Sequence, residues 1–167
     1  MPWRRYSETD RANRSRHSVS KLRHYSHSNS GVLSIHMKIY LAGPMRGIPE
    51  FNFPAFNKGA AMLRAEGHEV FNPAERDAKE YGAEFTQYVK DHQTSDEKDV
   101  AKFGCTIRDC LTADLHWICT QADAIALLPG WDNSKGVRAE LATANALGLQ
   151  VTYLVALEEG GYHWVKQ

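Results

Sequence analysis

The chain has 167 residues, of which 43% are hydrophobic, so it can build one domain with a proper core but hardly two. Its formal net charge is zero, but the charges are unevenly distributed. Residues 1–36 are basic, with seven Lys and Arg against two Asp and Glu, whereas the rest of the chain is acidic, with thirteen Lys and Arg against eighteen Asp and Glu. The acidic composition argues against stable nucleic-acid binding, and no apolar run approaches the roughly 18 residues of a membrane-spanning helix.

Residues 1–36 are rich in Arg, Ser and His and show no apolar periodicity, which predicts a disordered basic tail before a domain at residues 37–167. This segment lacks the apolar core of a secretory signal. The three cysteines, Cys105, Cys110 and Cys119, include no CxxC pair and indicate neither a disulfide framework nor a zinc site. We therefore expect a cytoplasmic protein that needs no metal or other cofactor.

The first half of the domain has the pattern of a strand, a helix and a second strand. Met37–Ala42 is apolar and β-prone, and Gly43–Pro44 ends it at once, as expected of a buried strand that leads into a functional loop. Phe53–Glu66 carries apolar residues at helical spacing, and Val70–Phe71 is a short apolar strand. This order predicts one right-handed βαβ unit.

Two segments of different character follow. Glu75–Phe103 is polar and charged with weak helical spacing, and we expect a long surface insertion of the kind that often forms a lid. The next segment predicts a helix, on which Leu111, Leu115 and Ile118 form an apolar stripe facing the sheet. Asp114 lies at the margin of that stripe, although an isolated Asp there is more often only an edge residue.

The last part of the domain repeats the alternation. Asp123–Leu128 predicts a buried strand, Pro129–Ser134 a turn and Val137–Leu147 a helix. Glu140 lies at the edge of the apolar stripe of this helix, so its carboxylate is aimed at a partly buried place. The alternative is an acidic residue that the dipole of the helix N-terminus stabilises. Val151–Leu157 predicts one more strand, with Glu158–Gln167 as a short exit segment.

These elements predict an α/β domain with a flavodoxin/Rossmann-like, doubly wound parallel sheet of four to five strands. Ligands of such sheets bind at the carboxyl ends of the strands, where three loops should converge, namely Gly43–Gly47, the loop from Pro73 onward, and Pro129–Gly136. The first loop carries Arg46, and the second leads into a helix N-terminus whose free N–H groups favour an anion such as phosphate. The sequence therefore indicates a phosphate pocket beside Glu140.

Several short motifs follow one another in a definite order, namely Tyr40–Pro44, Asp114–Leu115, Ala122–Asp123, Leu127–Trp131 and Ser134–Glu140. Together they resemble the nucleoside 2-deoxyribosyltransferase-like superfamily, in particular its phage- and bacteria-associated members, over residues 37–158. The resemblance implies a flavodoxin-like sheet, a Glu that attacks C1′ of a sugar, a Tyr that holds this Glu, and an Asp that contacts or protonates the leaving base. By match of motif, these roles fall on Glu140, Tyr40 and Asp114.

The same resemblance implies a substrate site made by Gly43, Pro44, Met45, Arg46, Gly47, Trp131, Ser134 and Gly136. In the nucleoside transferases the position six before the nucleophile is commonly Asp, which meets a free 5′-hydroxyl. In the related nucleoside 5′-monophosphate N-glycosidases it is Ser, paired with an Arg of the first loop. Ser134 and Arg46 therefore point to a monophosphate, and Phe51, Phe53 and Trp131 are candidates for an aromatic wall around the base.

We thus expect an enzyme that cleaves or exchanges the N-glycosidic bond of a (deoxy)nucleoside 5′-monophosphate. The reaction needs a carboxylate beneath the sugar and a proton donor near the base, as in retaining glycosidases. Glu140 should be ionised, whereas partial burial should raise the pKa of Asp114. The alternatives are a non-catalytic nucleotide-binding module, a phosphoribohydrolase and an NAD-cleaving relative.

We also expect a homodimer or larger homo-oligomer. Trp117 lies off the apolar stripe of its helix, and Trp is enriched at the cores of protein interfaces. The resemblance implies dimers or larger rings, which agrees. The alternative is that the Glu75–Phe103 insertion covers Trp117.

Overall fold

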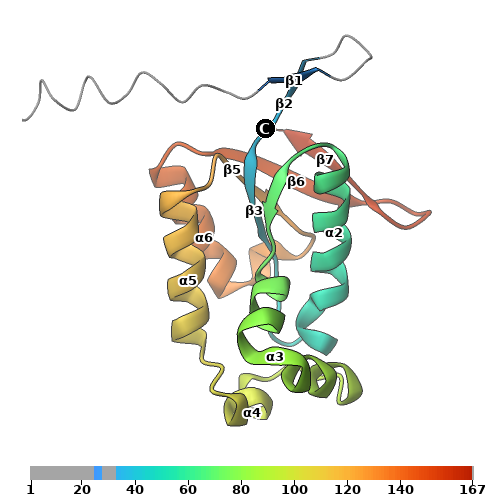
Figure 1. Ribbon diagram of the computed structural model, residues 1–167, viewed down its shortest axis with the longest axis vertical. Coiled ribbons are helices and arrows are strands. Elements are labelled where there is room, and N and C mark those ends of the chain that lie inside the picture. The colour runs from blue at the N-terminus through green and yellow to red at the C-terminus, as the bar shows by residue number, and fades with distance from the viewer. Residues whose placement is uncertain (1–24, 28–32, 167) are drawn as a thin grey trace, which may run out of the picture. The chain divides into compact units, whose positions relative to one another are not determined.

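Figure 1 shows a computed structural model of the chain, which describes residues 25–27 and 33–166. The chain forms two units, Met1–His36 and Met37–Gln167. In the first unit, β1 (Tyr25–His27) pairs with β2 (Leu33–Ile35) as an antiparallel hairpin that the composition did not predict. The other residues of the predicted disordered tail, up to residue 32, lie outside the described part.

The second unit is built on a five-stranded sheet in the order β4-β3-β5-β6-β7. Its strands are β3 (Lys38–Ala42), β4 (Glu69–Phe71), β5 (Ala124–Leu127), β6 (Gln150–Ala156) and β7 (Tyr162–Lys166). The first four are parallel, in the order typical of a flavodoxin-like sheet, and β7 is antiparallel to β6. The predicted fold class is therefore confirmed. The exit segment predicted at Glu158–Gln167 is wrong, because most of it forms the turn and edge strand of a hairpin with β6.

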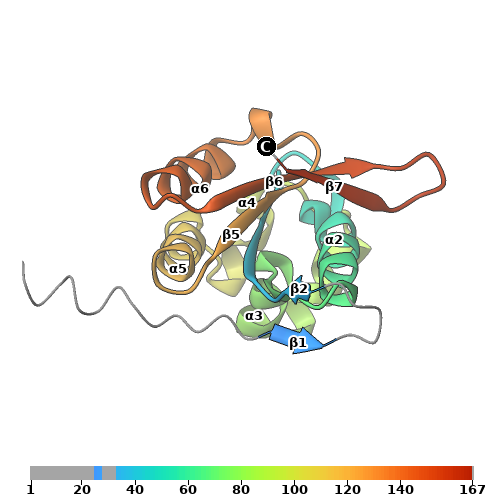
Figure 2. The ribbon, with the colours of Figure 1, turned by 90° about the horizontal axis from the view of Figure 1, so that it is seen from above.

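Helices cover both faces of the sheet, as Figure 2 shows from above. They are α2 (Phe53–Ala65), α3 (Pro73–Asp91), the short α4 (Glu97–Val100), α5 (Ile107–Thr120) and α6 (Lys135–Ala146). Side chains of α2 and α3 share one core cluster with Ile39 and Leu41 of β3, whereas α5 and α6 share the other with Tyr40 and Ala42. Successive residues of β3 thus point to opposite layers. No helix in the described part is long and apolar enough to cross a membrane.

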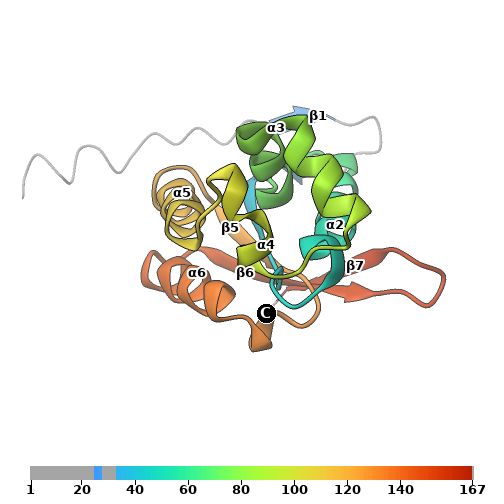
Figure 3. The same ribbon diagram turned by 90° about the horizontal axis from the view of Figure 1, so that it is seen from below.

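The long surface insertion predicted at Glu75–Phe103 is wrong. The segment folds mainly as α3 and α4, and it buries Phe85, Val89 and Val100 in the core cluster on the α2 side of the sheet. Gly82, with φ 84°, interrupts α3 and breaks the helical spacing of its apolar residues. Seen from below in Figure 3, α3, α4, α5 and α6 surround the carboxyl edge of the sheet.

The helix α5 is turned differently from the prediction. Its buried residues are Asp114 and Ile118, while Leu111 and Leu115 are only half-buried. Trp117 stacks on Phe71 at the end of β4, with ring centroids 4.9 Å apart. Trp117 therefore packs partly within its own domain and stays half-buried, and the homo-oligomer remains a prediction.

Candidate active site

Glu140 is held inside the domain by the first two turns of α6. Ser134 caps this helix, because its Oγ accepts a hydrogen bond of 3.3 Å from the backbone N–H of Val137. Val137 and Ala144, one turn to either side of Glu140, are fully buried against the sheet. Glu140 shares that face and is only 7% exposed. Its predicted position at the edge of the stripe is confirmed, and the helix dipole alone does not explain a carboxyl group this deep.

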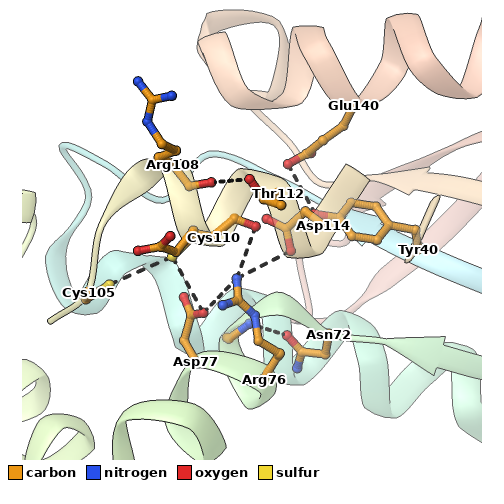
Figure 4. Close-up of polar contacts among 12 residues, drawn as sticks. Tyr40, Asn72, Arg76, Asp77, Cys105, Arg108, Cys110, Thr112, Asp114 and Glu140 are labelled. Atoms are coloured by element: carbon orange, nitrogen blue, oxygen red, sulfur yellow. Dashed lines mark hydrogen bonds and ion pairs between the residues drawn. The ribbon is translucent and has the colours of Figure 1, made fainter. Parts of the chain in front are cut away.

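Tyr40 supplies the partner of that carboxyl group. It lies in the middle of β3, is fully buried, and donates a hydrogen bond of 3.1 Å from its hydroxyl to Glu140 Oε1 (Figure 4). Stacking on Phe71 at 5.5 Å fixes the plane of its ring. The strand and the helix, 100 residues apart in sequence, thus meet in one rigid contact.

Asp114 brings a second carboxyl group to the same region from α5. It is buried, and its Oδ1 lies 3.5 Å from Nη2 of Arg76 without making a hydrogen bond within the described residues. Arg76 comes from the first turn of α3 and was not predicted. Its Nη2 also lies 3.0 Å from Asp77 Oδ1 and donates to the carbonyl oxygen of Cys110 at 3.4 Å (Figure 4). This guanidinium therefore links α3 to Asp114 and Cys110 of α5.

The pKa values of the two carboxyl groups are shifted by different amounts. Burial, and then the charge of Asp114, raise the pKa of Glu140 to about 8, against the opposing hydrogen bond from Tyr40. Burial raises the pKa of Asp114 to about 6, while Arg76 and Tyr40 lower it. The raised pKa of Asp114 agrees with the expectation, whereas the raised pKa of Glu140 opposes the ionised state expected of it. Because the two carboxyl groups interact, they titrate as a pair.

These groups line a pocket of about 230 Å³ at the carboxyl edge of the sheet. The predicted residues that line it are Gly43, Met45, Arg46, Asp114, Ser134, Gly136 and Glu140. Tyr40 does not line the pocket, but its hydroxyl contacts Glu140, which does. The loops after β3 and β5 touch each other, since a Cβ built on Gly43 would lie 2.8 Å from Leu128.

Other predicted site residues do not line the pocket. The carbonyl oxygen of Pro44 accepts a hydrogen bond of 2.9 Å from Asn52, and the N–H of Gly47 donates one of 3.0 Å to Ser95, so both residues hold the shape of the loop. Trp131 packs on Tyr153, with ring centroids 5.8 Å apart. Of the candidate aromatic wall, only Phe51 reaches the pocket, because Phe53 packs into the core beside Phe85.

Much of the pocket wall was not predicted. Its additional apolar side chains are Phe85, Val100, Ile107, Leu111 and Val137, and its additional polar ones are Asp77, Glu97, Cys105, Cys110 and Lys135. Most come from α3, α4 and the start of α5, which follow the end of β4. The loop from Pro73 onward was expected at the ligand edge, and the residues that follow it do line the pocket, although the individual side chains were not predicted.

One end of the pocket is suited to an anion. Lys135 and Gly136 open α6, so their backbone N–H groups have no partner within the helix, and the helix dipole adds positive potential. Arg46 lies on the neighbouring loop, half-exposed, with Nη1 3.7 Å from Glu97 Oε2. Such an exposed ion pair is worth roughly 0–1 kcal/mol, so a ligand phosphate can replace Glu97. No cluster of three or more metal-ligating side chains occurs within the described residues.

Comparison with known proteins places the chain in a family without assigning an activity. The model of a family described as "Domain of unknown function (DUF4406)" matches residues 37–153, which include every residue of the pocket. No curated protein and no solved structure matched the chain. Because the match covers well over half of its length, the chain belongs to this DUF4406 family.

Proposed function

We propose that the protein cleaves or exchanges the N-glycosidic bond of a (deoxy)nucleoside 5′-monophosphate, with Glu140 as nucleophile. The observation that carries the proposal is the pairing of buried Glu140 with the Tyr40 hydroxyl, beside a second buried carboxyl group and one turn from an anion-binding helix end. The resemblance of the same residues to the nucleoside 2-deoxyribosyltransferase-like superfamily supports it.

The reaction follows from these positions. An oxygen of ionised Glu140 attacks C1′ of the sugar, the bond from C1′ to the base nitrogen breaks, and its electron pair leaves with the base. Asp114 donates a proton to the departing base. Water, or a second base, then attacks C1′, Asp114 takes up the proton of the attacking group, and the Glu140 carboxylate is released.

This chemistry needs one proton on the carboxyl pair, held by Asp114 while Glu140 is ionised. Positive charge that develops at C1′ favours an ionised Glu140, and acceptor atoms of the base favour a protonated Asp114. Bound substrate therefore favours the negative charge on Glu140 and the proton on Asp114. The Tyr40 hydroxyl assists, because it stabilises the ionised form of Glu140.

The phosphate position follows from the same geometry. A 5′-phosphate at the N-terminus of α6 meets the N–H groups of that helix, the Ser134 hydroxyl and the Arg46 guanidinium. Glu140, on the next turn of the helix, then lies under the sugar. The apolar side chains Phe51, Val100 and Leu111 provide a wall for the base.

The test is to incubate the full chain with deoxyribo- and ribonucleoside 5′-monophosphates and the corresponding nucleosides, and to follow free base by chromatography. We expect base release from monophosphates, no release by Glu140→Gln, and normal release by Glu158→Gln, which changes an exposed residue. Near-normal turnover by Glu140→Gln would overturn the role of Glu140. Nucleotide binding without base release by the wild type would instead identify a nucleotide-binding module.

A further inference from the structure

Asp77 is a buried acidic residue of the pocket that the proposed chemistry does not use. It lies on the second turn of α3, is 6% exposed, and lines the pocket. Its Oδ1 lies 3.0 Å from Arg76 Nη2 and accepts a weak hydrogen bond from the Cys110 thiol at 3.9 Å. Its Oδ2 makes no hydrogen bond to any described residue. A buried carboxyl group therefore faces the pocket with an unused acceptor atom.

The order of the strands places Asp77 opposite the phosphate end. The helix α3 follows β4, which lies on one side of β3, whereas α6 follows β5 on the other side. Figure 4 shows Glu140, Asp114 and Asp77 at successive positions across the site. With the phosphate at α6 and the sugar over Glu140, the base lies against Asp114 and its far edge reaches Asp77.

The wall at this end offers acceptors and no cation. The basic side chains that line the pocket, Arg46 and Lys135, belong to the phosphate end. Arg76 does not line the pocket, and its Nη2 contacts Asp77, Asp114 and the Cys110 carbonyl oxygen. A base edge that carries an amino group can donate to Asp77 Oδ2, whereas a carbonyl oxygen there would meet another oxygen.

We infer that Asp77 selects nucleotides whose base carries an exocyclic amino group, by accepting a hydrogen bond from that group at the far end of the pocket. This inference rests on the proposed function for the orientation of the substrate. It distinguishes cytosine, adenine and guanine from uracil, thymine and hypoxanthine.

The most direct test uses the pair dCMP and dUMP, which differ in the 4-amino or 4-oxo group and in the hydrogen on N3. Burial raises the pKa of Asp77 to about 8, against the opposing charge of Arg76, so the preference should be largest above pH 8, where Asp77 is ionised and can only accept. At that pH we expect wild-type protein to release cytosine at least roughly tenfold faster than uracil, since a hydrogen bond from the amino group to a charged carboxylate is lost with dUMP. Equal rates, or a preference for dUMP, would overturn the inference while leaving the proposed function intact.

Substitution of Asp77 gives a second test. Asp77→Asn offers an amide that can also donate, so the cytosine-to-uracil ratio should fall at least severalfold, while Glu80→Gln on the exposed side of the same helix should keep it. Melting curves verify that both variants are folded. An unchanged ratio of cytosine to uracil release in folded Asp77→Asn would show that Asp77 does not select the base.

A binding measurement separates this inference from the proposed function. Calorimetric titration of Glu140→Gln with dCMP and dUMP reports base preference without turnover. Tighter binding of dCMP supports the inference even if the wild type releases no base, in which case the proposed function alone fails. Equal binding, or no binding of either nucleotide, overturns the inference.

Discussion

The substitution Tyr40→Phe tests the contact on which the proposed site depends. It removes one hydroxyl group from a fully buried ring and leaves the stacking on Phe71 in place. The lost hydroxyl donates to Glu140 Oε1 at 3.1 Å and lowers the pKa of both Glu140 and Asp114. The variant therefore changes the protonation of the carboxyl pair while the fold is kept.

The effect of Tyr40→Phe is expected in the pH dependence of base release. In the wild type, both carboxyl groups are protonated well below pH 6 and both are ionised well above pH 8, so activity should be bell-shaped between limbs near these values. A hydrogen bond to a charged group is worth about 1.5–3 kcal/mol, or roughly one to two pKa units. Without the hydroxyl both pKa values rise, so both limbs should move to higher pH by up to that amount.

The assay is the rate of base release from a nucleoside 5′-monophosphate between pH 5 and 10, with circular dichroism to verify folding. Activity of Tyr40→Phe at pH 7 should fall roughly tenfold or more and recover in part at higher pH. Tyr153→Phe is the matched control, because Tyr153 packs on Trp131 and does not line the pocket. A Tyr40→Phe profile with unmoved limbs would refute the assigned role of the Tyr40 hydroxyl.

Two further outcomes follow from the site. Arg46→Ala should reduce the preference for 5′-monophosphates over nucleosides roughly tenfold or more, and an unchanged ratio of base-release rates would remove Arg46 from the phosphate site. Burial raises the pKa of Glu140 from 4.5 to about 8, so folding favours its protonated form, and the free energy of unfolding should fall as pH rises between these values. At pH 8, the free energy of unfolding of Glu140→Gln should therefore exceed that of the wild type by on the order of a few kcal/mol. Urea denaturation at pH 5 and pH 8 would show whether this difference appears only at the higher pH.

Local patterns in the sequence were sufficient to find the parts of the site that belong to regular elements. Glu140 could be placed because the apolar stripe of α6 and the capping Ser134 are both short-range features. The loop after β3 could be placed because Gly43–Pro44 ends an apolar strand. The contact between Tyr40 and Glu140 spans 100 residues and came only from the resemblance of motifs.

The far wall of the pocket escaped prediction for a physical reason. Gly82 interrupts α3, and the exposed charged residues around it dilute the apolar periodicity that marks a helix. With α3 interpreted as a loop, Arg76 and Asp77 had no defined position. The pKa shifts of Glu140 and Asp114 also could not be compared from the sequence, because the burial of these two residues depends on elements from the whole domain.

Gly43 joins a local signal to a tertiary constraint and leads to a last prediction. The sequence marks it as the end of a strand, and it has no positive φ, so its backbone does not require glycine. A Cβ at this position would lie 2.8 Å and 2.9 Å from side-chain atoms of Leu128 and 3.1 Å from Phe56. Leu128 cannot move away freely, because its backbone N–H donates a hydrogen bond of 2.8 Å to the carbonyl oxygen of Ala42.

Gly43→Ala should therefore push the loops after β3 and β5 apart. Overpacking of this kind costs roughly 1–3 kcal/mol, which urea denaturation would measure. The same displacement moves Arg46 away from the N-terminus of α6, so the preference for monophosphates should weaken together with stability. A variant that kept both its stability and its preference would show that the close contact of the two loops does not hold the phosphate site together.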